Sequence, residues 1–256
     1  MDIDKLAEQG VGYRAWPDKL DPAKITIVMI HGAGGRAEIW NAQIRPLGKE
    51  FNAVAIDLPG HGNTPKGTYT DISDYARWLG EIIESCCEGP VVLMGHSMGG
   101  AICQALAIER AVLLRGMVLV STGARLKVAP AILDGLKEDF DKTVELIIKY
   151  AYSASAPPVM LSQGADLMKE SGPEVLYSDF AACNRFDLRS KISEITVPTY
   201  IVCGEDDKLT PPSLSQKLAK EIKSSKLSII PNAGHMVMIE AWKAFNSAVS
   251  EFIKSL

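Results

Sequence analysis

One serine stands in a sequence context that predicts nucleophilic chemistry. Ser97 is the centre of the pentapeptide GHSMG at 95–99, which directly follows the apolar run 90–94. A G-x-S-x-G turn between a buried strand and a helix strains its central residue and exposes the serine oxygen at the top of a sheet. A Cβ atom at either glycine would collide with neighbouring strand or helix backbone. The motif therefore predicts an enzyme that works through an acyl-Ser97 intermediate.

This serine needs a base, because a serine hydroxyl is a poor nucleophile at neutral pH. The chain has four histidines: His31, His61, His96 and His235. Two of them stand in glycine-rich turns, and His96 is the direct neighbour of the serine. His235 lies in the loop after the last apolar run and is the candidate base. The alternative is a loop histidine that only makes a hydrogen bond.

The base in turn needs a carboxylate that fixes its tautomer and stabilises the imidazolium. The loop after the fifth apolar run offers Glu205, Asp206 and Asp207. The loop after the fourth run offers only Ser121 and Thr122 and cannot supply an acid. The residues alone do not rank Asp206 against Asp207.

Acyl transfer also requires backbone N–H groups that face the developing tetrahedral oxygen. The elbow itself supplies one of them, the N–H of Met98. We expect the second in the turn HGAGG at 31–35, with Ala33 as the candidate donor. The alternative is a plain turn that ends a strand.

The elements that would position these residues are short apolar strands alternating with amphipathic helices. The continuous apolar runs lie at 25–30, 53–56, 91–94, 117–120, 199–203 and 227–230. Such runs are typical of parallel strands that are covered on both faces. Residues 71–86 carry a clean apolar stripe at helical spacing, and the last helix has an apolar face from Ala241 and Trp242 to Ile253. The pattern predicts an α/β fold with a mostly parallel, doubly wound sheet.

One stretch interrupts this alternation. Between 125 and 190 there are only short helical patterns, such as 143–150 and 174–183, separated by proline and glycine. We therefore expect a core made of 1–124 and 191–256 and a helical cap at 125–190. An insertion at the carboxyl edge of the sheet would lie over the ligand crevice and shape an acyl pocket. Four methionines either line that pocket or fill the core: Met98, Met160, Met168 and Met236.

Composition excludes several classes of protein. The 256 residues carry a net charge of −4, which argues against nucleic-acid binding. Lysines at 217, 220, 223 and 226 have the spacing of one exposed helix face. No group of His, Cys and Asp has metal-ligand spacing, so neither a metal nor a cofactor is expected.

Cysteine usage and the N-terminus predict a cytoplasmic protein. The five cysteines are odd in number and lack C-x-x-C spacing: Cys86, Cys87, Cys103, Cys183 and Cys203. Reduced thiols are typical of an intracellular setting, and Cys103 and Cys203 fit small core residues. The first residues have no signal-peptide pattern, and no apolar segment is long enough for a membrane span.

The chain resembles the α/β-hydrolase family, in particular the small cap-bearing serine esterases. That group includes carboxylesterases, cofactor-free haloperoxidases and 3-oxoadipate enol-lactonase. The motifs that carry the resemblance are HGAG at 31–34, DLPGHG at 57–62, GHSMGG at 95–100, GEDD at 204–207 and GH at 234–235. The order of serine, acid and histidine along the chain is also that of the family.

The resemblance implies a role for each candidate. The family's G-x-x-D pattern selects Asp207 over Asp206, with Ser97 as nucleophile and His235 as base. Ala33 falls in the oxyanion turn, and the DLPGHG turn has a mainly structural role. A serine at the elbow argues against the alkyl-enzyme chemistry of dehalogenases and most epoxide hydrolases, which use aspartate there.

Together these residues predict a carboxylesterase for short to medium acyl esters, either a monomer or a homodimer. Alternatives on the same residues are a lactonase or perhydrolase and a thioesterase or acyltransferase for coenzyme A thioesters. For a coenzyme A substrate, cations at the cap junctions would meet phosphates: Arg125, Lys127, Arg185, Arg189 and Lys191. An alternative of another class is a ligand receptor that keeps the fold.

Overall fold

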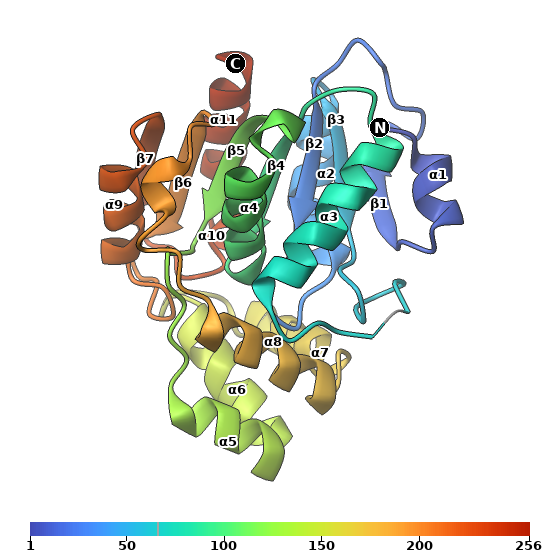
Figure 1. The fold of residues 1–256 in the computed structure, drawn as a ribbon. Coiled ribbons are helices and arrows are strands. Elements are labelled where there is room, and N and C mark those ends of the chain that lie inside the picture. The colour runs from blue at the N-terminus through green and yellow to red at the C-terminus, as the bar shows by residue number, and fades with distance from the viewer. Residues whose placement is uncertain (66) are drawn as a thin grey trace.

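A single mixed sheet forms the centre of the molecule. The computed structural model describes residues 1–65 and 67–256. Within them, the sheet has the strand order β1-β3-β2-β4-β5-β6-β7 (Figure 1). The strands are β1 (Tyr13–Trp16), β2 (Thr26–Ile30), β3 (Asn52–Ile56), β4 (Val91–His96), β5 (Leu114–Val120), β6 (Thr199–Gly204) and β7 (Ser225–Ile230). All neighbours pair in parallel except β1, which runs antiparallel to β3. The predicted mostly parallel α/β sheet is confirmed.

The inner strands are apolar because both of their faces are covered. Every residue of β2, β3, β4 and β6 is buried. Each fully buried Val, Leu or Ile side chain contributes about 1.5–3 kcal/mol relative to exposure. The edge strands differ. In β7 only Ile230 is buried, and Ile229 is 36% exposed, so the expectation of coverage on both faces is wrong there.

Strand β1 is an addition to the predicted elements. It has four residues, is half-buried and lies at the edge of the sheet beyond β3. A short edge strand needs no continuous apolar run, because one side of its ladder faces solvent. Its signal is therefore too weak to separate from a loop.

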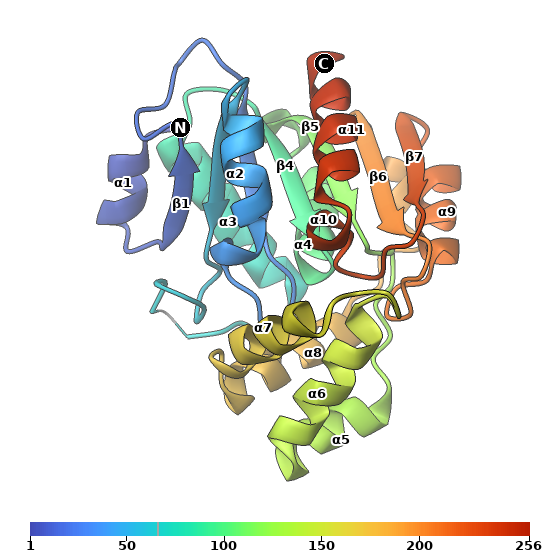
Figure 2. The same cartoon turned by 180° about the vertical axis from the view of Figure 1, so that it is seen from behind.

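Helices cover both faces of the sheet (Figures 1 and 2). One face carries α3 (Ile72–Cys86), α4 (Met98–Glu109) and α9 (Pro212–Glu221). The other carries α2 (Asn41–Gly48), α10 (Val237–Glu240) and α11 (Trp242–Lys254). A short α1 (Ile3–Glu8) packs against α3, and 3-10 turns lie at Ala37–Trp40, Ala111–Leu113 and Ile192–Glu194.

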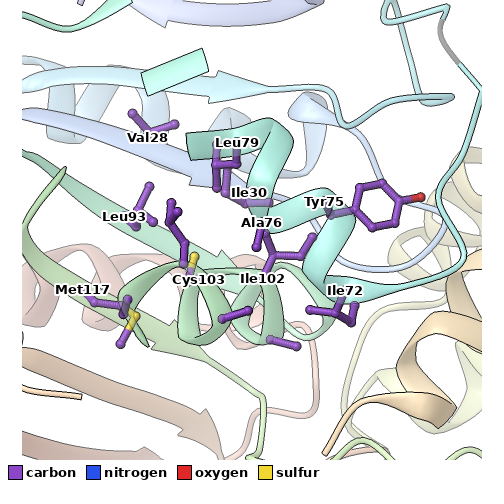
Figure 3. Packing of buried hydrophobic residues seen from close by; sticks show 14 of the residues in the cluster. Val28, Ile30, Ile72, Tyr75, Ala76, Leu79, Leu93, Ile102, Cys103 and Met117 are labelled. Atoms are coloured by element: carbon purple, nitrogen blue, oxygen red, sulfur yellow. The ribbon is translucent and has the colours of Figure 1, made fainter. Parts of the chain in front are cut away.

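The α3 stripe packs as its spacing predicts. Asp71 caps the helix by accepting the Ser73 N–H at 3.0 Å. The predicted stripe is buried throughout, and Figure 3 shows part of it against Leu93 of β4 and Ile102 and Cys103 of α4. Cys103 and Cys203 are both fully buried, as predicted.

Two sequence expectations about helix faces are wrong. Trp242 does not join the apolar face of α11: it is 41% exposed, and the Lys243 ammonium lies 5.4 Å from its ring centroid. The lysine spacing does not mark one helix either. Helix α9 ends at Glu221, because Ile222 takes an extended conformation and is buried where the chain turns toward β7. Lys223 and Lys226 therefore lie beyond the helix.

Four helices between β5 and β6 form the insertion, which we call the cap. They are α5 (Pro130–Glu138), α6 (Phe140–Ala151), α7 (Pro158–Lys169) and α8 (Pro173–Arg185). The cap lies beyond the carboxyl ends of the parallel strands and has an apolar cluster of its own (Figure 1). Prolines in this stretch begin helices α5, α7 and α8, a position where the missing N–H costs nothing. The boundaries at 125 and 190 stay a prediction. An isolated bridge joins Arg125 to Asp187 where the chain leaves and re-enters the core.

No helix in the described part of the chain combines the length and apolar character that crossing a bilayer requires.

Candidate active site

Ser97 lies in a strained turn between β4 and α4. Its φ of 52° and ψ of −113° fall outside the regions that side-chain-bearing residues normally adopt. Such a residue costs on the order of 1–3 kcal/mol and persists only where its surroundings hold it. Its N–H donates to the carbonyl of Val120 at 2.9 Å.

The flanking glycines are required by close backbone approach, as the motif predicts. A Cβ atom at Gly95 would meet the carbonyl oxygen of Gly99. A Cβ atom at Gly99 would lie 2.5 Å from the carbonyl oxygen of Ile30 on β2. The turn can therefore be tight only with glycine at both positions.

His235 and Asp207 form a buried hydrogen-bonded pair. They follow β7 and β6, and they are 5% and 3% exposed. The His235 Nδ1 lies 2.9 Å from Asp207 Oδ2. An ionised carboxylate accepts only, so Nδ1 carries the proton and Nε2 is left as the acceptor. Glu205 and Asp206, the other acids of this loop, are exposed.

Asp207 is held in its ionised form by its partners. Its carboxylate accepts from the N–H groups of Leu209 at 3.0 Å and Thr210 at 2.8 Å, and from the Thr210 hydroxyl at 2.8 Å. Burial alone raises the pKa of Asp207. The charge and hydrogen bond of His235 and the Thr210 bonds outweigh burial, so the net pKa lies below its ordinary value.

Thr210 contacts both members of this pair and was not singled out from the sequence. Its hydroxyl lies 3.0 Å from His235 Nδ1 as well as on the Asp207 carboxylate. The available signal was the spacing, since an aspartate commonly accepts N–H groups two and three residues ahead in a turn.

His96 packs against His235 and bonds to its backbone. Its Nε2 lies 3.1 Å from the His235 carbonyl oxygen, and the two rings are 4.6 Å apart. Burial and then the charge of His235 lower the pKa of His96 to about 3. It is therefore neutral across the physiological range and donates from Nε2.

Ser97 and His235 line the same cavity but make no direct hydrogen bond within the described residues. The carbonyl of Ser97 accepts the Thr122 hydroxyl at 2.8 Å. Hydrogen bonds between nucleophile and base are often long in ligand-free enzymes and tighten when substrate is present. The structure thus joins Asp207 to His235 directly, and it places Ser97 on the wall of the cavity that His235 also lines.

The two backbone N–H candidates face different surroundings. Ala33 lines the cavity at a turn closed by the Gly35 N–H on the Gly32 carbonyl at 3.0 Å. Met98 is the first residue of α4, where N–H groups have no partner within the helix. In the described part of the chain, neither N–H donates a hydrogen bond to another residue.

A cavity of about 1200 Å³ connects these residues with the cap. Its cap wall is mainly apolar, with Ile132, Ile147, Ile148, Met160, Leu167, Met168 and Phe180. Met236 also lines it, whereas the Met98 side chain is fully buried in the core.

The cations on the cavity wall are Arg125, Lys127, Arg189, Lys208 and Lys217. The remaining two expected cations, Arg185 and Lys191, do not line it. Within residues 1–65 and 67–256, no three His, Cys, Asp or Glu side chains are grouped as a metal site requires.

This chain belongs to the α/β-hydrolase family. A match to the family described as "Alpha/beta hydrolase family" covers residues 27–248. A similar relative is the pimeloyl-[acyl-carrier protein] methyl ester esterase of Neisseria meningitidis, 25% identical over 90% of this chain and 94% of the relative. Another is the (E)-2-((N-methylformamido)methylene)succinate hydrolase of Acinetobacter baylyi, 27% identical over 90% of each chain. The protein is therefore a hydrolase.

Solved structures agree with this placement. A thermophilic esterase superposes with a TM-score of 0.83 at 32% identity and covers 100% of this chain and 96% of its own. The enol-lactonase from Burkholderia xenovorans LB400 has a TM-score of 0.87 at 22% identity over 95% and 96% of the two chains, which shows the shared fold. The resemblance to α/β-hydrolases of the esterase type, drawn from the motifs, is confirmed.

Proposed function

We propose that the protein is a serine carboxylesterase that hydrolyses esters of short to medium acyl chains. The observation that carries the proposal is the buried His235–Asp207 pair at 2.9 Å, whose His235 lies on the wall of the cavity that strained Ser97 also lines. A strained serine beside an oriented imidazole is what acyl transfer requires. The apolar cap wall suits the acyl chain.

The reaction follows from these positions. His235 Nε2 takes the hydroxyl proton of Ser97 while the serine oxygen attacks the ester carbonyl carbon. The tetrahedral oxyanion is bound by the N–H groups of Ala33 and Met98. When the C–O bond breaks, His235 gives its proton to the leaving alcohol and Ser97 keeps the acyl group. Water, deprotonated by His235, then releases the acid and restores the serine.

Two features support an ester as the substrate. The similar relative from Neisseria meningitidis is by its name a methyl ester esterase, and the closely superposing solved structure is an esterase. An oxyanion site with two N–H donors also suits a carbonyl that becomes tetrahedral. Each such donor stabilises the transition state by about 3 kcal/mol.

The test is the variant Ser97→Ala, assayed on p-nitrophenyl butyrate. We expect turnover to fall by at least about 10³-fold with an unchanged melting temperature, because the alanine removes only the nucleophile. Ser121→Ala is the matched control. Ser121 also has a positive φ, 47°, but it is buried and does not line the cavity. Hydrolysis by Ser97→Ala at the parent rate would refute the mechanism.

A coenzyme A thioester is a second candidate substrate, favoured by the five cations on the cavity wall. Their charge is partly balanced, because Arg125 and Arg189 both bind Asp187 at 2.7 Å. Lys127 is exposed and makes no ion pair within the described residues. If phosphates bind there, Lys127→Ala will slow hydrolysis of butyryl-coenzyme A and leave the butyryl thioester of N-acetylcysteamine unaffected. Equal effects on both thioesters would exclude phosphate recognition.

A cytoplasmic location belongs to the same proposal. Cys86, Cys87, Cys103, Cys183 and Cys203 are all free thiols in the structure. Thiols of this kind persist in a reducing compartment. Fractionation of cells that express the protein would test the location.

A further inference from the structure

A buried carboxylate of the cap lies against the turn that carries Ala33. Asp179 comes from α8 and is completely buried. Its Oδ2 accepts the Gly34 N–H at 2.8 Å and lies 2.8 Å from His61 Nε2. Its Oδ1 accepts the Tyr75 hydroxyl at 3.1 Å. Figure 3 shows Tyr75 at one end of the α3 cluster, with its hydroxyl pointing away from the other labelled side chains.

His61 faces this carboxylate as a cation. Its Nδ1 lies 3.1 Å from the carbonyl oxygen of Pro59, so both ring nitrogens face acceptors. Burial alone lowers the pKa of His61, but the charge and hydrogen bond of Asp179 outweigh burial and the net pKa is raised. Removing a charged pair from water costs several kcal/mol per ion before any gain from pairing. Because the pair is retained in spite of this cost, we expect it to hold a neighbouring group in place, and the group that it binds is the Gly34 N–H.

A second cap residue holds the same glycine. The Ser171 hydroxyl donates to the Gly34 carbonyl at 2.9 Å. A Cβ atom at Gly34 would meet a methyl group of Leu176, and would lie 3.2 Å from the Cγ of Met168. Both polar groups of Gly34 are therefore bound by the cap, and its Cα packs against the cap.

Four-residue turns commonly adopt one of two arrangements, type I or type II, and the turn that carries Ala33 has the second. Residues 32–35 form a four-residue turn closed by a 3.0 Å hydrogen bond, with Gly34 at φ +61° in the third position. A positive φ at that position defines a type II turn, whose central peptide is rotated relative to a type I turn. The rotated peptide joins Ala33 to Gly34. Asp179, which accepts its N–H, therefore holds the peptide next to the candidate oxyanion donor.

We propose that Asp179 is a positioning residue for the oxyanion turn, supplied by the cap. Its carboxylate holds the Gly34 peptide in the type II arrangement, so that the N–H of Ala33 faces the space beside Ser97. The proposal rests on the proposed function for its effect on catalysis. The turn can then bind the oxyanion only while α8 packs against the core. The position of the cap is thereby linked to the rate of acyl transfer.

The experiment compares Asp179→Ala, Asp179→Asn and Ser171→Ala with a control, Asp141→Asn. Asp141 is an exposed cap aspartate that binds Lys169 at 3.0 Å and, within the described residues, makes no hydrogen bond to the turn. Rates on p-nitrophenyl butyrate are divided by the number of Ser97 residues that a fluorophosphonate labels exhaustively, so that unfolded protein does not count. Hydrogen exchange of a peptide covering 31–36 is measured in parallel.

For Asp179→Ala we expect kcat per labelled serine to fall about 10- to 100-fold while KM changes less than about threefold, a smaller loss than removing a donor outright. Asp179→Asn should fall less, because its amide oxygen still accepts from Gly34. Ser171→Ala leaves no buried charge without its partner and should lower kcat a few-fold. It therefore still tests the proposal if Asp179→Ala does not fold. Exchange of the turn peptide should be faster in each variant and unchanged in the control.

A parent-like kcat and parent-like exchange in Asp179→Ala or Ser171→Ala would overturn the proposal. The failure of the proposed function has a different signature, in which the parent neither turns over the ester nor is labelled at Ser97. Hydrogen exchange would still decide whether Asp179 holds the turn in that case.

Discussion

Asp207 illustrates how a single side chain is prepared for the proposed chemistry. Four hydrogen bonds from Leu209, Thr210 and His235 keep it charged although it is buried. Its folded pKa is depressed, so its contribution to stability is present above the unfolded pKa of about 3.9 and is lost as pH falls through the folded value. At neutral pH it therefore holds His235 with the proton on Nδ1.

Replacing this carboxylate by an amide should remove activity without removing the fold. In Asp207→Asn the NH₂ group can face Nδ1 and favours the wrong tautomer of His235. We expect kcat on p-nitrophenyl butyrate to fall about 10³- to 10⁴-fold at pH 7. The companion Thr210→Val, which removes only the hydroxyl beside Nδ1, should lower kcat by about threefold to tenfold. A kcat above a tenth of the parent value in Asp207→Asn would show that His235 is oriented by other groups.

At the scale of elements, the elbow depends on how closely β4, α4 and β2 approach. Strand β4 pairs with β2 on one side and β5 on the other, and α4 begins directly after Ser97. The N-terminus of α4 brings unpaired N–H groups and a partial positive charge to the position where the proposed reaction would develop negative charge. Packing of these elements, more than local propensity, keeps Ser97 at positive φ.

Gly99→Ala tests this close approach. The added Cβ would lie 2.5 Å and 2.6 Å from the carbonyl oxygens of Ile30 and His31, which are backbone atoms of the central sheet and its following turn. We expect a loss of about 1–3 kcal/mol in the free energy of unfolding measured in urea, in the range of overpacked cores. Gly89→Ala is the control, because nothing lies within 4 Å of its Cβ position. Equal stability of the two variants would show that the sheet yields easily.

If the proposed esterase function is correct, we expect the cap to set how long an acyl chain the cavity accepts. Met160 of α7 lines the cavity, whereas its neighbour Val159 is 58% exposed and does not line it. Met160→Trp should raise KM for p-nitrophenyl octanoate at least about tenfold relative to the acetate, because the larger ring fills space that the chain needs. Val159→Trp should leave the ratio unchanged. A parent-like ratio in Met160→Trp would place the acyl chain elsewhere.

At the scale of the whole molecule, buried histidines couple stability to pH. Burial lowers the pKa of His31 well below its ordinary value. Burial and the charge of His235 lower the pKa of His96 to about 3. Such groups stabilise the fold above the unfolded pKa of about 6.5, and this contribution is lost as pH falls below it. His61 has the opposite sign: its raised pKa gives stability below about 6.5 that is lost as pH rises through the folded value.

His96→Phe should therefore flatten the acid side of the stability curve. The pKa of His96 is about 3 in the folded state and about 6.5 in the unfolded state. This difference lowers the free energy of unfolding by about 2 kcal/mol when the pH falls from 7 to 5. The variant loses the hydrogen bond to His235, so its absolute stability is lower, but its change between the two pH values should be smaller by that amount. Urea unfolding at both pH values measures the difference. An unchanged pH dependence would mean that His96 titrates normally in the folded state.

The sequence by itself determined the inner sheet, the elbow and the family. Apolar runs, the GHSMG pentapeptide and the loop motifs depend on local spacing, and burial on both faces leaves a strong local signal in β2 to β6. The edge strand β1 and the exposure of Trp242 were not predicted, because both depend on packing against segments that are distant in the chain.

Only the tertiary structure decided which distant groups meet. Residues alone left Asp206 and Asp207 equal, and only the resemblance separated them, whereas in space Asp207 alone of the loop acids is buried against His235. No spacing in the chain announced that Asp179 would reach Gly34, 145 positions away, because a hydrogen bond between segments so far apart depends on how the cap packs on the core. Local pattern records what each segment buries, and the folded chain decides what that segment is buried against.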